Sequence, residues 1–317
     1  MSERHDPVTG HGFTLVHGDN VKAMAEMPEG AAALVVTSPP FEGFFTYSND
    51  GADAGNNSPA GFNLAWRFFT EQLFRVVAPG GTVVLHWTDL LAWGVKDGYA
   101  GLKEFGGRLH ESMREAGFHL RAKVAIEKDA QAVASRMHLH NIQFATLRKD
   151  TRKCWPIRND YLYVFQKDGE APPVTAFERG EITEAEWIEW ARGTWRGSET
   201  DVLQVRGTGH ADDTKHVCPL QLWVIDRCVR LWSNPGELVY DPYGGVGSTG
   251  YVALKRGRRY VGTELKAEYH LTAARTLGDL ERELRAQQVL FALDPPRPKK
   301  ARARKAPASA DVTDAAE

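Results

Sequence analysis

The chain has 317 residues, and its 39 lysines and arginines against 41 aspartates and glutamates give a formal net charge of −2. Its 42% apolar and 25% charged residues are typical of a folded globular protein and exclude a wholly disordered or fibrous chain. The longest smooth apolar run, Ala31 to Val36, is too short to span a bilayer, and the first residues lack the apolar stretch of a signal peptide. The three cysteines form no C-x-x-C pair, which supports neither a disulfide framework nor a cysteine-based zinc site. We therefore expect a cytoplasmic protein with no membrane segment and no metal.

The first part of the chain alternates predicted strands and helices. Phe13 to His17 and Ala31 to Val36 are predicted strands, and Val21 to Met27 between them has a helical pattern. Asn63 to Val77 carries apolar residues at helical spacing and precedes a strand over Thr82 to Trp87. This alternation predicts an α/β fold with a mostly parallel sheet and helices on both faces.

A long loop is predicted between these elements, from Glu42 to Gly61. The segment is rich in Gly, Asn, Asp and Ser, and so is too polar and too broken for a buried element. Loops of this length in compact domains are often functional.

The pattern is looser after a second helix-and-strand stretch, from Lys103 to Ile126. Tyr161 to Phe165 is a further predicted strand. Thr183 and Glu186 have the spacing of a capping box, which predicts a helix start. The tail from Pro295 mixes Lys and Arg with Pro and Ala and is predicted to be a disordered basic extension.

A glycine-rich turn between a strand and a helix is the strongest functional signal. The strand Leu238 to Tyr240 runs into Asp241-Pro242-Tyr243-Gly244-Gly245-Val246-Gly247-Ser248-Thr249-Gly250, and a helix over Tyr251 to Arg256 follows. Glycines let the backbone approach a ligand closely, and the helix start offers unpaired N–H groups. Glu264 ends the next predicted strand, where a carboxylate can accept hydrogen bonds from ribose hydroxyls. The turn also matches G-x-G-x-x-G, so a nicotinamide-dependent oxidoreductase is an alternative at this point.

The second signal is Ser38-Pro39-Pro40-Phe41, directly after the buried strand. Two prolines make a stiff turn whose carbonyl can point into a cleft, beside a serine hydroxyl that can accept a hydrogen bond. Together these acceptors can hold an amino group, and the aromatic ring can stack on a planar base.

These two motifs together resemble the S-adenosylmethionine-dependent DNA amino-methyltransferases. The amine-binding motif precedes the cofactor loop, which is similar to the circularly permuted β group of that family. The resemblance covers most of Phe13 to Glu264 and implies a Rossmann-like class I methyltransferase fold. Such a fold has a mostly parallel seven-stranded sheet, helices on both faces and an inserted target-recognition region.

The resemblance also implies roles for individual residues. Asp19 and Asn20 would lie by the cofactor adenine, Glu264 would hold the ribose, and Asp241 with the loop glycines would line the methionine side. The candidate cofactor-binding residues are Asp19, Asn20, Asp241, Pro242, Tyr243, Gly244, Gly245, Gly247, Thr249, Glu264 and His216. The candidate catalytic residues, which would hold the target base, are Ser38, Pro39, Pro40 and Phe41.

The resemblance further implies the substrate and the chemistry. Serine at position 38 favours cytosine N4 in double-stranded DNA, with adenine N6 in DNA or RNA as the alternative. The base would flip out of the duplex, and Glu42 to Gly61 would close over it. Methylation at carbon 5 of cytosine is disfavoured because no proline precedes a cysteine. A restriction-modification role follows from the family, and a homodimer is one alternative for the oligomeric state.

The resulting division of the chain has four parts. Residues 1–126 form a catalytic half with the amine-binding motif, and residues 127–213 form a target-recognition region. Residues 214–294 complete the catalytic domain as its cofactor-binding half, and residues 295–317 form the disordered basic tail.

Overall fold

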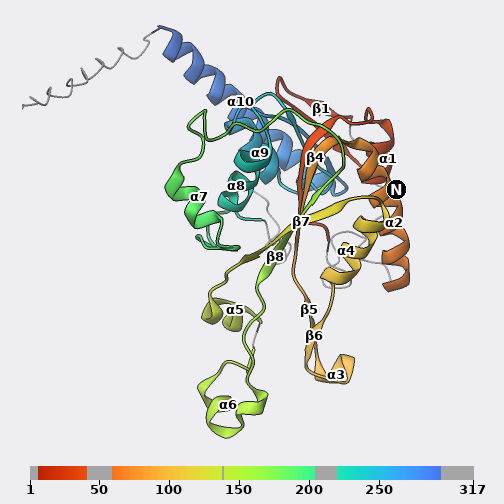
Figure 1. Cartoon of the computed structure of the whole chain (residues 1–317), viewed down its shortest axis with the longest axis vertical. Helices are drawn as coiled ribbons and strands as arrows, with labels where there is room; N and C mark the ends of the chain where they lie inside the picture. Colours follow the sequence, from red (N-terminus) through yellow and green to blue (C-terminus); the bar gives the residue numbers. More distant parts are fainter. Residues whose placement is uncertain (1–5, 41–58, 138, 204–219, 294–317) are drawn as a thin grey trace, which may run out of the picture.

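A sheet of nine strands forms the centre of the described part of the chain (Figure 1). The computed structural model describes residues 6–40, 59–137, 139–203 and 220–293. In spatial order the strands are β1 (Val8–Thr9), β2 (Phe13–His17), β11 (Arg259–Glu264), β10 (Leu238–Asp241), β3 (Ala32–Thr37), β4 (Val77–Trp87), β8 (Asp160–Gln166), β7 (His119–Ile126) and β9 (Thr194–Trp195).

The sheet is mixed in direction. The five neighbours from β2 to β4 pair in parallel, whereas β8 is antiparallel to both β4 and β7, and β1 is antiparallel to β2. The expected seven-stranded sheet is therefore corrected to a nine-stranded one. Strands β1 and β9 at the two edges have only two residues each, too few to leave an alternating apolar pattern in the sequence.

Helices cover both faces of the sheet, as predicted. The helices are α1 (Asn20–Glu26), α2 (Pro59–Val76), α3 (Gly94–Asp97), α4 (Gly106–Glu115), α5 (Ala130–Met137), α6 (Phe144–Lys149), α7 (Glu184–Trp190), α8 (Leu222–Trp232), α9 (Ser248–Lys255) and α10 (Ala267–Leu293), with a 3₁₀ turn at Thr151–Lys153. One core cluster packs α1, α2 and α4 against the sheet, and the other packs α8, α9 and α10 against its opposite face. No helix in these ranges is both long and apolar enough to cross a membrane.

Strand β3 explains why an unbroken apolar run marks the centre of the sheet. Leu34 and Val36 belong to one core cluster, and Val35 belongs to the other. Side chains on a strand alternate between faces, so a strand covered on both sides needs apolar residues at every position.

Most predicted elements are confirmed, with two corrections. The strand Phe13–His17 has the predicted bounds, and Thr183 with Glu186 forms the predicted capping box. Helix α2 begins at Pro59, so the end of the predicted loop Glu42 to Gly61 is helical, while residues 42–58 lie outside the described residues. The turn expected before Thr82 is a bulge within β4, because its register with β3 jumps from Val77 to Thr82. The basic tail also lies outside the described ranges.

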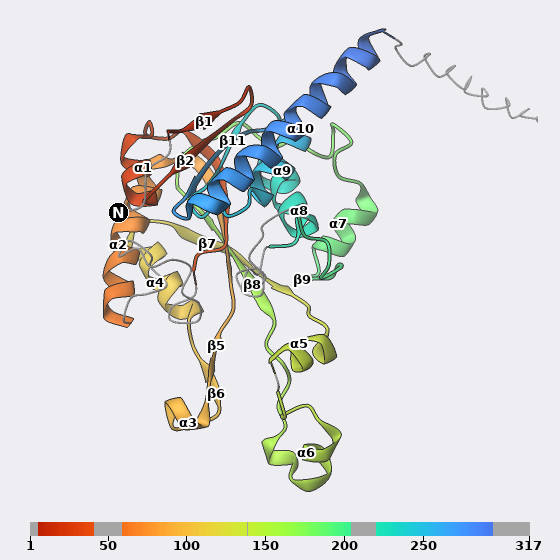
Figure 2. The same ribbon diagram turned by 180° about the vertical axis from the view of Figure 1, so that it is seen from behind.

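Two segments extend from the same end of the molecule (Figures 1 and 2). One follows β4 and consists of α3 with the antiparallel pair β5 (Leu90–Ala92) and β6 (Gly101–Lys103). The other, which we call the α5–α6 lobe (residues 127–159), follows β7 and leads into β8. Since β4 and β7 point the same way as the other parallel strands, both segments start at the carboxyl-end edge of the sheet.

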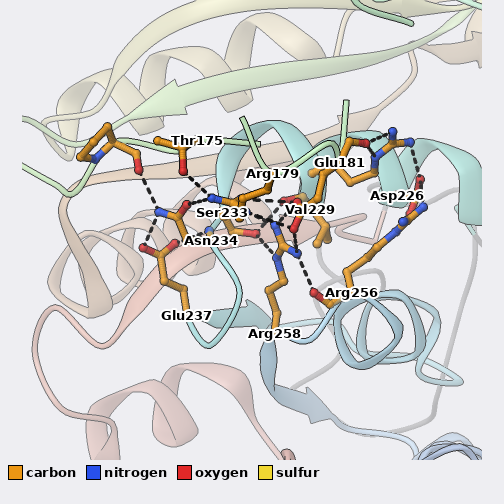
Figure 3. A network of polar contacts seen from close by, with 12 residues as sticks. Thr175, Arg179, Glu181, Asp226, Val229, Ser233, Asn234, Glu237, Arg256 and Arg258 are labelled. Atoms are coloured by element: carbon orange, nitrogen blue, oxygen red, sulfur yellow. Dashed lines mark hydrogen bonds and ion pairs between the residues drawn. The ribbon is translucent and has the colours of Figure 1, made fainter. Parts of the chain in front are cut away.

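A network of buried ion pairs attaches the segment after β8 to α8 and β11 (Figure 3). The Arg258 side chain is 0% exposed and donates to both carboxylate oxygens of Glu181, at 3.2 and 2.9 Å. It also donates to the Ser233 hydroxyl at 3.2 Å. Removing one partner of such a buried pair typically costs about 3–5 kcal/mol, because the remaining charge is left unpaired.

Arg230 extends this network to the first turn of α7. It donates to Glu186 at 2.8 Å and to Asp226 at 3.2 Å. Burial raises the pKa of Glu186, but hydrogen bonds from Arg230 and Thr183 outweigh burial and lower that pKa to about 2. The pair therefore makes stability depend on pH in a defined window.

We expect the Glu186→Gln variant to be less stable than the wild type at pH 7. A carboxyl pKa that is lower in the folded state contributes stability above its unfolded value, near 4.5, and this contribution is lost as the pH falls towards 2. Urea unfolding of both proteins between pH 7 and pH 2 measures the difference, which should shrink steadily below pH 4.5. The control is Glu184→Gln, an exposed position on the same helix. A wild-type advantage that stays constant down to pH 2 would contradict the assignment.

Candidate functional site

A cavity of about 230 Å³ opens at the carboxyl ends of β2, β3, β10 and β11. After β10 the chain continues through α9 to β11 on one side, and after β3 it continues through α2 to β4 on the other. This divergence is a topological switch point, where open α/β sheets form their ligand crevice. The cavity is lined by Gly18, Asp19, Asn20, Val21, Ser38, Pro40, Phe62, Ala65, Trp66, Phe69, Leu220, Ile225, Asp241, Pro242, Tyr243, Gly244, Gly245, Val246, Ser248, Thr249, Thr263, Glu264, Leu265, Lys266 and Tyr269.

The carboxylate of Asp241, which lines this cavity, connects β3, α9 and the glycine loop by hydrogen bonds. Thr37 at the end of β3 donates to Oδ1 at 2.7 Å, and Thr249 in the first turn of α9 donates to Oδ2 at 2.7 Å. The backbone N–H of Tyr243 also donates to Oδ1, at 3.0 Å. Complete burial raises the pKa of Asp241, and the three donors only partly offset that effect. Asp241 therefore holds the glycine loop in place, with both oxygens already accepting hydrogen bonds.

The glycine loop lies against β11. The N–H of Gly244 donates to the carbonyl of Thr263 at 2.8 Å. Gly247 precedes α9 with φ of 93°, a left-handed conformation that glycine adopts without steric cost. Gly250, in the first turn of α9, faces the buried ring of Tyr260, where an added Cβ would lie 2.5 Å from a ring carbon. The loop thus has its glycines where the backbone turns and where the helix approaches the strand.

The end of β11 brings the acidic residue of the motif to the loop. Glu264 accepts from the N–H of Gly245 and from the N–H of Lys266, at 2.8 Å each. Each oxygen of the Glu264 carboxylate therefore accepts a backbone N–H beside the cavity. The backbone of Glu264 also accepts from the N–H of Gly18 at 2.9 Å, which joins β2 to β11 beside the cavity.

The turn after β2 supplies the third wall. Asp19 caps α1 by accepting from the N–H of Lys22 at 2.9 Å, and the amide of Asn20 donates to the carbonyl of Pro242 at 3.3 Å. This contact links the turn after β2 to the glycine loop, across 222 residues of sequence. Both residues line the cavity.

The Ser-Pro-Pro turn reaches the same cavity from β3. Ser38 is half-buried, its hydroxyl lies 2.8 Å from Nδ1 of His86, and both prolines are buried. Ser38 and Pro40 line the cavity, whereas Pro39 and Gly247 are not among the lining residues. Phe41 and His216, the other two candidates, lie outside the described residues.

Lining residues on α2 and near the start of α10 were not predicted. Helix α2 contributes an aromatic wall from Phe62, Trp66 and Phe69, and the ring of Phe69 lies 5.4 Å from that of Tyr243. The helical spacing of these residues is the same as that of ordinary core positions, so the sequence gives no sign of a ligand wall. Lys266 and Tyr269, near the start of α10, are also in the lining. Among the described residues, no group of three His, Cys, Asp or Glu side chains is placed to hold a metal ion.

A family model described as DNA methylase, N6_N4_Mtase, matches residues 32–275. This range contains both the Ser-Pro-Pro turn and the glycine loop. The type II methyltransferase M.Cfr9I of Citrobacter freundii is 26% identical over 282 residues, which are 84% of this chain and 88% of the relative.

Solved structures share the fold. TTHA0409 of Thermus thermophilus, complexed with S-adenosyl-L-methionine, matches with a TM-score of 0.61 at 21% identity, over 84% of this chain and 93% of that one. PvuII DNA methyltransferase, named as cytosine-N4-specific, matches with a TM-score of 0.59 at 17% identity, over 89% and 95% of the two chains.

Two glycines inside helices allow a matched test of the packing at the loop. A Cβ at Gly250 would overlap the ring of Tyr260, whereas a Cβ at Gly278 in α10 meets nothing within 4 Å. We expect Gly250→Ala to lower the free energy of unfolding by about 1–3 kcal/mol, since a buried ring must shift. Gly278→Ala should instead raise it by about 1 kcal/mol through helix propensity. Urea unfolding measures both, and equal effects of the two substitutions would show that Tyr260 does not restrict the loop.

Proposed function

The chain belongs to the N6_N4_Mtase family of DNA methylases, and from that membership we propose that it methylates the exocyclic amine of a flipped base in double-stranded DNA, with cytosine N4 as the acceptor. S-adenosylmethionine is the methyl donor. The order of the two motifs along the chain supports a place in the β group of this family. Family membership also favours methyl transfer over the nicotinamide chemistry that the G-x-G-x-x-G pattern alone left open.

One observation carries the proposal: the Ser-Pro-Pro turn and the glycine loop line the same cavity. The turn offers acceptors for an amine, and the loop offers a close backbone approach for a nucleotide-like cofactor. An acceptor amine and a methyl donor must lie in contact for transfer, and β3 and β10 are paired neighbours, so the turn after β3 and the loop after β10 lie side by side.

The residues of the cavity fit S-adenosylmethionine. When bound, this cofactor supplies a methyl group on a positively charged sulfur. Three carboxylates, from Asp19, Asp241 and Glu264, line the cavity together with one lysine, Lys266, a balance that favours a cation. The Glu264 carboxylate, which lines the cavity, would accept hydrogen bonds from the hydroxyls of a ribose. Asp241 acts mainly by fixing the loop, because its oxygens already accept three hydrogen bonds.

Ser38 and Pro39 would act on the base. The lone pair of a base amine is delocalised into the ring, so the amine is a weak nucleophile. Accepting one N–H at the Ser38 hydroxyl and the other at the Pro39 carbonyl would orient the amine and localise its lone pair towards the donor methyl group. Such catalysis depends on positioning and electrostatics and needs no strong base, since the alkylated amine releases its proton readily. The aromatic wall of α2 would exclude water from the transfer.

Double-stranded DNA suits the segments that extend from the sheet edge where the cavity opens. The α5–α6 lobe exposes four basic side chains at positions 148, 149, 152 and 153. Of its three acidic residues, Asp150 pairs with Arg152, Glu127 pairs with Arg196, and Asp129 is exposed. Phosphates of the duplex need such cations. Strands β8 and β9 lie within residues 127–213 but pair with the main sheet. The protruding α5–α6 lobe is therefore our candidate for target recognition.

The reaction product tests the proposal directly. Purified protein is incubated with methyl-labelled S-adenosylmethionine and mixed-sequence duplex DNA, and the digested nucleosides are identified by mass spectrometry. We expect N4-methylcytosine. N6-methyladenine would leave the fold and the site unchanged and would make adenine the target base. If a parallel incubation with RNA gave the only labelled product, RNA would replace DNA as the substrate. Protein that binds neither this cofactor nor DNA would contradict the proposal.

The contribution of the α5–α6 lobe to DNA affinity can be measured separately. We expect the triple variant Arg148→Ala, Lys149→Ala, Lys153→Ala to bind duplex DNA more weakly, with a salt dependence reduced by a slope of about 0.9 for each phosphate that is no longer neutralised. Cofactor affinity should not change. The matched control removes three exposed basic side chains from α9 and α10, at Lys255, Arg275 and Arg285. Equal losses of DNA affinity in both triple variants would show that the lobe is not part of the DNA interface.

A further inference from the structure

A chain of polar contacts runs from Ser38 into the protein, away from the cavity. The Ser38 hydroxyl lies 2.8 Å from Nδ1 of His86, and Nε2 of His86 lies 3.1 Å from Oδ2 of Asp160. The ammonium group of Lys128 lies 2.5 Å from the same oxygen. His86 and Asp160 are each only 5% exposed, so water does not compete for these contacts.

Strand pairing sets the positions of Ser38, His86 and Asp160 in this chain of contacts. Thr37 pairs with Leu85 across β3 and β4, so the next residues, Ser38 and His86, are neighbours at the carboxyl ends of adjacent strands. Asp160 is the first residue of β8, which pairs with β4 along six positions. The contacts therefore depend on the register of the central sheet and not on a loop.

The carboxylate of Asp160 determines how the imidazole is protonated. Burial raises the pKa of Asp160, but hydrogen bonds from His86 and Lys128 and the charge of Lys128 outweigh burial and lower that pKa well below its ordinary value. An ionised carboxylate can only accept, so Nε2 of His86 must carry a hydrogen and donate it. In the neutral imidazole, Nδ1 then carries a lone pair and accepts from the Ser38 hydroxyl.

We infer that His86, oriented by Asp160, is a positioning residue that makes the Ser38 hydroxyl an obligatory hydrogen-bond acceptor towards the cavity. The hydroxyl hydrogen of Ser38 is committed to His86, so only oxygen lone pairs remain for a ligand. An amine brings N–H donors to these lone pairs, whereas a base carbonyl would meet them unpaired and lose affinity. The site would thus select an amino group over a carbonyl oxygen at the same ring position, an inference that rests on the proposed function.

The first test compares turnover with binding. His86→Phe removes the acceptor of the Ser38 hydrogen, and we expect kcat to fall on the order of 100-fold, as when one preorganised hydrogen-bond partner is lost at an active site. KM for DNA and Kd for S-adenosylmethionine should change little, because neither the DNA-binding lobe nor the glycine loop is altered. His86→Asn, whose side-chain oxygen can replace Nδ1 as an acceptor, should recover part of the rate.

Asp160→Asn tests the tautomer. An asparagine amide can donate to Nε2, which would place the imidazole hydrogen on Nδ1 and turn the Ser38 hydrogen towards the cavity. We expect a loss of kcat at least as large as that of His86→Phe, by the logic that an amide in place of the orienting carboxylate selects the wrong tautomer. Should this variant not fold, because Lys128 loses its buried partner, the two His86 variants decide the matter.

A double variant separates action through Ser38 from a general structural role. Once Ser38→Ala has removed the hydroxyl, adding His86→Phe should slow transfer no further. If the two losses multiply instead, His86 does not act through Ser38 and the inference is overturned. His110→Phe is the matched control: this histidine on α4 also packs on β8, 6.1 Å from the ring of Phe165, but does not contact Ser38. It should retain wild-type kcat.

The same assay distinguishes failure of the role of His86 from failure of the proposed function. An active wild type with a His86→Phe variant within about threefold of its kcat would overturn the role of His86 and leave the proposed function intact. A wild type that binds the cofactor but transfers no methyl group to any nucleic acid would overturn the proposed function and this inference with it.

Discussion

The hydrogen bonds of the buried Asp241 carboxylate are the constraint on which the site depends. Strands β10 and β3 pair directly at only two positions, Val239 with Leu34 and Tyr240 with Val35. Beyond these positions the chains diverge, and the Thr37–Asp241–Thr249 contacts join them to the start of α9. The residue after Thr37 is Ser38, so the same contacts set the distance between the proposed amine acceptor and the proposed cofactor loop. A single ionisable side chain therefore fixes the relative position of the two halves of the cavity.

A second buried carboxylate, Asp160, lies on the other side of Ser38, and its pKa is shifted in the opposite direction from that of Asp241. The pKa of Asp241 is raised, because burial is opposed only by two hydroxyls and one backbone N–H. The pKa of Asp160 is lowered, because burial is outweighed by an imidazole and an ammonium group. A charged partner such as the Lys128 ammonium group stabilises an anion more than a neutral donor does. Asp160 therefore serves as a fixed anion that can orient His86, while Asp241 serves as a multiple acceptor that shapes a turn. Identical side chains take different roles because of what surrounds them.

Much of this arrangement can be predicted from the sequence. The features that cannot be predicted depend on contacts between residues far apart along the chain. The strand Phe13–His17, the buried run before Thr37 and the loop at Asp241 depend on local pattern and turn chemistry, which the sequence displays directly. Two-residue edge strands, the bulge before Thr82 and the aromatic wall of α2 depend on partners distant along the chain. His86 illustrates the limit. Within an apolar strand it resembles a core histidine, and only the register of β3, β4 and β8 brings it between Ser38 and Asp160.

The net charge of −2 understates how well the chain suits a polyanion, because its acidic side chains are not equally available. In the acidic stretch around α7, the carboxylates of Glu181 and Glu186 are held by Arg258 and Arg230 inside the network that attaches this segment to α8. Paired and partly buried, these anions contribute little field at the surface. In the α5–α6 lobe, Arg148, Lys149 and Lys153 are exposed, and none of the described ion pairs involves them. Potential near a surface is set by unpaired charges within roughly a Debye length, about 8 Å at physiological salt. A near-neutral chain can thus present a local cluster of exposed cations at Arg148, Lys149 and Lys153, because net charge does not describe where the charges lie.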